Sequence, residues 1–162
     1  MANGFSPAEV VNIAIGVERR GAAFYDTLGR SSQNVATRET FENLAQMEHG
    51  HIAVFQKLSG QIKPTKVSGE EAEELAAYFK ALMDNAVFSD DLASHSLLDD
   101  VNTDDEAIDT AMEAEKDSIL FYYQLKEIVD TGAFNVIDQI ISEEKDHLRQ
   151  LSKLRATLST GK

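Results

Sequence analysis

The segment Ala45-Gln46-Met47-Glu48-His49-Gly50-His51 contains a Glu-x-x-His motif that recurs in Glu144-Lys145-Asp146-His147. Residues three apart lie on one face of an α-helix, so each motif directs a carboxylate and an imidazole the same way. Apolar residues continue the same face on both sides of each motif: Phe41, Leu44, Phe55 and Leu58 around the first, and Ile137, Ile140, Leu151 and Leu154 around the second. Both motifs are therefore predicted to face a hydrophobic core.

Two further glutamates, Glu18 and Glu115, interrupt apolar stripes about 30 residues before the motifs. Their stripes are Val11, Ala14, Ala22 and Tyr25 in one segment, and Ile108, Ala111, Tyr122 and Leu125 in the other. Alternating spacings of three and four are typical of helices in a bundle. Period-two alternation is not sustained anywhere in the sequence, so we expect an all-α four-helix bundle with no sheet.

Capping signals predict where these helices begin and end. Ser6-Pro7-Ala8-Glu9 and Thr103-Asp104-Asp105-Glu106 are capping boxes, and Gly60 is a stop signal. The predicted helices cover residues 7–29, 35–59, 104–131 and 134–158. We expect one domain over residues 1–162, with a crossover at 60–103 that holds a helix at about 69–88 and room for another short helix.

An internal repeat relates the two helical hairpins. Adding 97 to Glu18 gives Glu115, and adding 96 to the first Glu-x-x-His motif gives the second. Two hairpins packed about a pseudo-two-fold axis would bring all these side chains to one level of the core. The candidate ligands are Glu18, Glu48, His51, Glu115, Glu144 and His147.

Charge balance explains why such a layer indicates a metal pair. Four buried carboxylates repel one another severely unless cations neutralise them, and two divalent ions balance their formal charge. Oxygen ligands with one imidazole per ion suit iron, manganese or zinc. One Glu-x-x-His motif occurs often by chance, and a lone Glu in an apolar stripe can reach solvent. The paired occurrence of both features favours two metal ions.

Other polar residues near the motifs have simpler interpretations. Tyr25 and Tyr122 each follow a candidate ligand by seven residues, as core tyrosines or as hydrogen-bond donors to ligating carboxylates. We interpret His49 and His95 as surface residues. Glu143 and Asp146 are interpreted as outer-face charges, although Asp146 could support a histidine. We expect no catalytic residue beyond the metal ligands.

Composition excludes several classes of function. The 162 residues contain no cysteine, which excludes disulfides, thiolate metal sites and iron–sulfur clusters in this chain. The formal net charge of −13 disfavours nucleic acid and anionic lipid as partners. The sequence shows neither a secretory signal nor a membrane-spanning segment, so we expect a cytoplasmic protein.

The four bundle segments resemble the rubrerythrin branch of the ferritin-like superfamily. The resemblance rests on Glu18 with Tyr25, Glu115 with Tyr122, and the phrases at residues 45–51 and 141–148. It implies a ferritin-like bundle with a non-haem di-iron centre that reacts with hydrogen peroxide or dioxygen in oxidative stress. It also implies a homodimer or larger homo-oligomer.

The sequence departs from rubrerythrin in two respects. The rubredoxin module of that family needs four cysteines, so a peroxidase here would need a separate electron-donor protein. The additional glutamate ligand of that family is replaced by Ser118. The symmetric six-ligand site that results favours a ferroxidase over a peroxidase. An iron-storage protein and a bundle with a purely structural metal pair are the alternatives.

Overall fold

The computed structural model describes residues 7–61, 74, 77–78, 80–82, 101–129 and 131–160. Four long helices account for most of these residues: α1 (Pro7–Ser31), α2 (Val35–Ser59), α5 (Asp104–Ile128) and α6 (Phe134–Thr160). A short 3-10 helix, η1 (Thr131–Ala133), lies between α5 and α6. The described residues contain no strand, and the prediction of an all-α bundle is confirmed.

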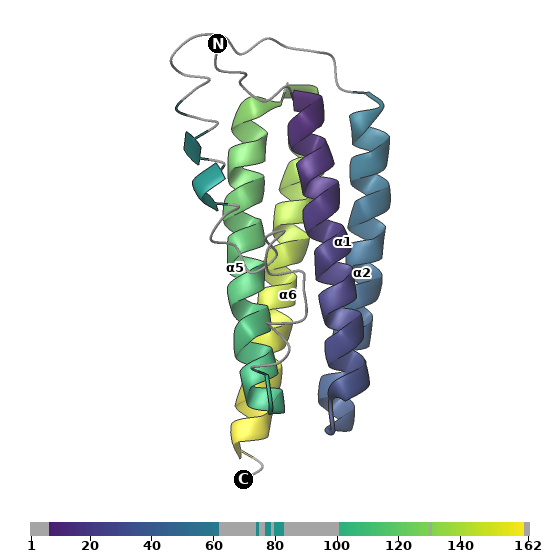
Figure 1. Ribbon diagram of the computed structural model, residues 1–162, viewed down its shortest axis with the longest axis vertical. Helices are drawn as coiled ribbons and strands as arrows, with labels where there is room; N and C mark the ends of the chain where they lie inside the picture. Colours follow the sequence, from purple (N-terminus) through teal and green to yellow (C-terminus); the bar gives the residue numbers. More distant parts are fainter. Residues whose placement is uncertain are drawn as a thin grey trace.

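The four helices form a bundle in which each one contacts two neighbours (Figure 1). α1 packs against α2 and α5, and α6 packs against the same two helices. α1 and α6 run downward in Figure 1, whereas α2 and α5 run upward. The end of α2 and the start of α5 therefore lie at opposite ends of the bundle, which is the reason that a long connection joins them.

Local capping explains both ends of α2 and the start of α5. The side chain of Asn34 accepts a hydrogen bond of 3.2 Å from the backbone N–H of Thr37 at the start of α2. Thr103 and Glu106 form the predicted capping box at the start of α5. Gly60 caps α2 in a right-handed conformation. Ser6, the predicted cap of α1, lies outside the described residues.

The predicted end of the third helix was wrong. α5 ends at Ile128 rather than at residue 131, because Val129 adopts an extended conformation with ψ of 161°. In this conformation the Val129 side chain stays buried in the core, and η1 starts two residues later. The helix thus ends before the Thr131-Gly132 signal is reached.

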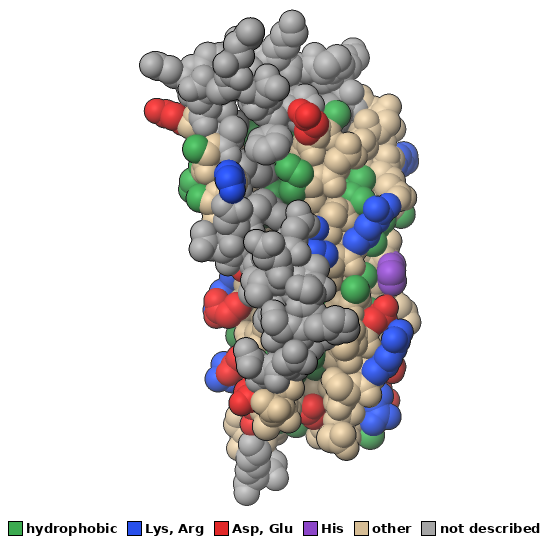
Figure 2. Space-filling model, in the orientation of Figure 1, with side chains coloured by type: hydrophobic (Ala, Val, Ile, Leu, Met, Phe, Trp, Pro, Cys, Tyr) green, Lys and Arg blue, Asp and Glu red, His purple; other side chains and the backbone are tan. Residues whose placement is uncertain are grey.

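The predicted crossover helix is tested at few positions. Residues 74, 77–78 and 80–82 are helical, and the remainder of the predicted 69–88 segment lies outside the described residues. Within the part of the chain that is described, no helix has the length and apolar character needed to cross a membrane. Figure 2 shows acidic and basic side chains interspersed over the described surface of one face, so neither sign gathers into one patch there.

Candidate metal centre

All six predicted ligands lie in the middle of the core. Each is at most 3% exposed, which is exceptional for charged side chains. All four helices contribute: Glu18 comes from α1, Glu48 and His51 from α2, Glu115 from α5, and Glu144 and His147 from α6. The repeat therefore brings residues from distant parts of the chain into one buried polar layer.

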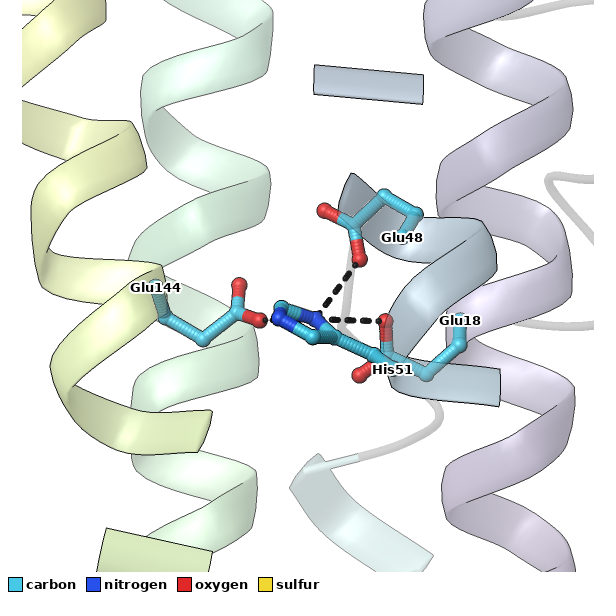
Figure 3. Close-up of side chains that lie close together, drawn as sticks. All are labelled: Glu18, Glu48, His51 and Glu144. Atoms are coloured by element: carbon cyan, nitrogen blue, oxygen red, sulfur yellow. Dashed lines mark hydrogen bonds and ion pairs between the residues drawn. The ribbon is translucent and has the colours of Figure 1, made fainter. Parts of the chain in front are cut away.

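One half of this layer is organised around His51, whose ring lies between α2 and α6 in Figure 3. His51 Nδ1 lies 3.3 Å from Glu18 Oε2 and 3.3 Å from Glu48 Oε2. It also lies 2.9 Å from Glu144 Oε1. Three carboxylates from three helices thus converge on one nitrogen of a single imidazole ring.

The other half is organised in the same way around His147. Its Nδ1 lies 3.4 Å from Glu48 Oε1 and 3.4 Å from Glu115 Oε1. Glu144 Oε2 is 3.7 Å from the same nitrogen. The rings of His51 and His147 are nearly parallel, with centroids 5.5 Å apart and an interplanar angle of 15°.

Glu48 and Glu144 belong to both halves. Each directs one carboxylate oxygen toward His51 and the other oxygen toward His147. In each of the two overlapping groups the ligand atoms lie within 4.8 Å of one another. This is the arrangement that two carboxylates need to bridge two metal ions, with one further Glu and one His for each ion.

The two tyrosines connect the hairpins. The Tyr25 hydroxyl on α1 donates to Glu115 Oε1 on α5, and the Tyr122 hydroxyl on α5 donates to Glu18 Oε1 on α1. Both tyrosines are fully buried. Each therefore orients a carboxylate of the other hairpin, which agrees with the second of their two predicted roles.

Comparison with known proteins identifies the family. The rubrerythrin family model matches residues 9–155. The chain belongs to the rubrerythrin family. No curated protein matches the chain significantly. The structure is similar to a crystal structure from Thermotoga maritima, of a protein described as ferritin-like and diiron-carboxylate. The two chains are 25% identical with a TM-score of 0.66, and the match covers 96% of this chain and 98% of that one.

In this rubrerythrin-family chain, burial and neighbouring charges shift the pKa values of the predicted ligands. Burial, followed by the nearby Glu48 carboxylate, raises the pKa of Glu18 well above its usual value. Burial and the same neighbour raise the pKa of Glu144. Burial lowers the pKa of His147, but the close carboxylates of Glu115 and Glu48 outweigh it and raise this pKa to about 9.

His51 and Glu48 form the oppositely charged core of the same network. Burial disfavours the charged form of His51, but the surrounding carboxylates, Glu144 first among them, outweigh it and raise its pKa. Burial likewise acts to raise the pKa of Glu48, yet the nearby Glu18 and the two histidines lower it. Deprotonated carboxylates and neutral imidazoles are what a metal ion requires, so binding would release protons.

The unsatisfied atoms of the layer fit metal ions. Both oxygens of Glu144, Oε2 of Glu115 and both ring nitrogens of His147 are buried and make no hydrogen bond to the described residues. The close approach of Glu144 Oε1 to His51 lacks hydrogen-bond geometry. Native cores rarely leave so many buried polar atoms unpaired in one place. Two divalent ions would coordinate the carboxylate oxygens and His147 Nδ1, and they would balance the four carboxylates.

One residue near the centre was interpreted wrongly from the sequence. Glu143 was assigned to the outer face, but its Oε2 lies 2.8 Å from His51 Nε2. Asp146, the suggested histidine partner, instead forms an ion pair with Arg149. His49 is exposed as predicted, with an ion pair to Asp26, and His95 lies outside the described residues. The contact of Glu143 depends on how α6 is rotated against α2, which helical spacing does not specify.

Proposed function

We propose that this chain is a non-haem di-iron oxidoreductase that reacts with hydrogen peroxide or dioxygen. The observation that carries the proposal is the pair of overlapping ligand groups that share Glu48 and Glu144. Glu18 and His51 would complete the ligands of one ion, and Glu115 and His147 those of the other. The diiron-carboxylate description of the similar Thermotoga maritima protein supports iron over manganese or zinc.

The residues around the centre suit electron transfer to a small oxidant. A pair of ferrous ions held by these residues would provide the two electrons that, with two protons, reduce one hydrogen peroxide to two water molecules. Tyr25 and Tyr122 hold the carboxylates that are not shared. Phe41 stacks on Tyr25 and Phe55 packs against Tyr122, so apolar rings surround the polar layer and keep bulk water away from it.

A ferroxidase reaction and a peroxidase cycle differ in the source of their electrons. This sequence has no cysteine with which to bind an iron–sulfur centre of its own. We therefore propose that oxidation of loaded Fe(II) needs only this chain, whereas sustained peroxide reduction takes electrons from a separate donor protein. The six-ligand site, with the buried Ser118 one turn after Glu115, supports the ferroxidase reaction as the simpler assignment.

The proposal is tested by anaerobic loading with Fe(II), metal analysis, and rapid mixing with peroxide or dioxygen. We expect two irons per chain and rapid formation of ferric absorbance, with one peroxide consumed per iron pair. Glu48→Gln and Glu144→Gln should lose the pair, and the exposed Glu113→Gln serves as the matched control. A wild-type chain that binds two irons but does not oxidise them faster than free Fe(II) would refute the activity.

The same experiment separates the two alternatives. Continued uptake of iron far beyond two ions per chain, together with a large assembly in analytical ultracentrifugation, would indicate storage. A zinc-loaded chain that is greatly stabilised against heat, combined with an iron-loaded chain inert to both oxidants, would indicate a structural metal pair.

A further inference from the structure

Glu143 makes the two halves of the centre different. Its Oε2 lies 2.8 Å from His51 Nε2, on the ring edge opposite the three carboxylates. Its other oxygen accepts a hydrogen bond of 2.9 Å from the side chain of Gln139. The Glu143 side chain is 35% exposed, whereas His51 is buried. A partly solvated carboxylate is thus held against the outer nitrogen of one candidate ligand.

The repeat places a different residue at the corresponding position. Adding 96 to Met47 gives Glu143, just as it relates Glu48 to Glu144. Met47 and Glu143 are both half-buried, as equivalent positions should be. A methionine thioether is only a weak acceptor. His147 Nε2 is buried, and within the described part of the chain it has no hydrogen-bond partner.

This difference changes how well each imidazole can bind a metal ion. A carboxylate at Nε2 keeps the ring proton on that nitrogen and leaves Nδ1 free to act as the ligand. It also fixes the ring orientation and increases the electron-donating strength of the imidazole. Among the described residues, His51 has this support and His147 does not, although the inner ligands of the two halves are of the same types.

We propose that Glu143 is a positioning residue that makes the two metal positions unequal. The position at Glu18 and His51 binds its ion more tightly and fills first, and the position at Glu115 and His147 fills second. This inference rests on the proposed metal pair. Loss of a partner of this kind typically weakens metal binding about 10–100-fold, which sets the difference expected between the two steps.

The test compares wild-type protein with Glu143→Met, Glu143→Gln and the exchange variant Met47→Glu/Glu143→Met. Cobalt(II) is the probe, followed by calorimetry and by its visible absorption. Crystals grown with one cobalt per chain report the occupancy of each position through anomalous scattering. Circular dichroism checks that the variants fold, which we expect because neither position is fully buried.

We expect two separable binding steps in the wild type and anomalous density mainly at the His51 position. Glu143→Met should weaken the first step about 10–100-fold and merge the steps. Glu143→Gln keeps a hydrogen-bond acceptor without the charge, so it should retain part of the difference in affinity between the two steps. The exchange variant should move the density to the His147 position.

Two results would overturn the inference. They are equal occupancy of both positions in the wild type, and an exchange variant that still fills the His51 position first. Both results leave the metal pair intact, so they contradict the inference alone. A wild-type chain that binds no pair of cobalt or iron ions would contradict the proposed function, and this inference with it.

Discussion

The half of the centre around His51 and the half around His147 share their inner residues but not their surroundings. Both halves have one unshared glutamate, one histidine, two shared carboxylates and one tyrosine from the opposite hairpin. Outside the rings, Glu143 contacts His51, whereas His147 has no such partner among the described residues. The ligands and the tyrosines that contact them are thus repeated in both halves, whereas the residue outside the histidine ring differs.

The largest effect should come from removing a shared carboxylate. Glu144→Ala removes one ligand oxygen from each of the two metal positions, so it should lower bound metal from two ions per chain to none. Glu115→Ala affects the His147 half alone and should leave one ion bound. Metal analysis after gel filtration measures both variants. Equal losses for the two variants would show that Glu144 does not bridge.

The second effect is a loss of stability of the metal-free protein as pH rises. The folded-state pKa of His147 is about 9, so its protonation stabilises the fold below about pH 6.5 and this stabilisation is lost through pH 9. The pKa values of Glu18 and Glu144 are also raised, so their contribution is present at low pH and lost in the same direction. Glu48, with its lowered pKa, opposes this only in acid, where its contribution is lost as pH falls.

Denaturant unfolding of metal-free and metal-loaded protein between pH 6 and pH 9 measures this effect. We expect the metal-free chain to lose on the order of a few kcal/mol over this range. The loaded chain should be nearly insensitive to pH, because ions replace the protons. Parallel curves for the two forms would show that the protons of this layer do not contribute to stability.

Substitution of either tyrosine should have a smaller effect on metal affinity, and the two effects should be equal in size. Tyr25→Phe removes the donor to Glu115, and Tyr122→Phe removes the donor to Glu18. Each substitution should reduce affinity for the ion in the affected half about 10-fold. Cobalt calorimetry on the two variants measures the losses. If one tyrosine matters far more than the other, the two halves differ inside the ligand layer as well as outside it.

The smallest effect is expected at the histidine next to the first motif. His49 is exposed and lies 3.9 Å from Asp26, so His49→Ala should change the unfolding free energy by less than about 0.5 kcal/mol. Metal content should be unchanged. His51→Ala, two residues away, should lose the ion of its half. A large effect of His49→Ala on metal binding would contradict the assignment of ligands.

The sequence predicted the bundle and the convergence of the six residues because both follow from short-range periodicity. Glu48 and His51 are on one face by helical spacing, and the repeat relates them to Glu144 and His147. The sequence did not predict that Tyr25 reaches Glu115 and Tyr122 reaches Glu18, since those contacts depend on how two helices are placed side by side. The early end of α5 at Ile128 was missed because no stop signal precedes Thr131-Gly132 in the sequence.

The two Glu-x-x-His motifs thus determine by themselves that charged groups enter the core at matched levels. The free-energy cost of a charged side chain in an apolar stripe can be recognised from neighbouring positions in the sequence, without a structure. The packing of α2 against α6 decided which oxygen of Glu48 faces which histidine. The same packing brought Glu143 into contact with His51. Such contacts depend on helix rotation and side-chain direction, and the linear spacing of residues specifies neither.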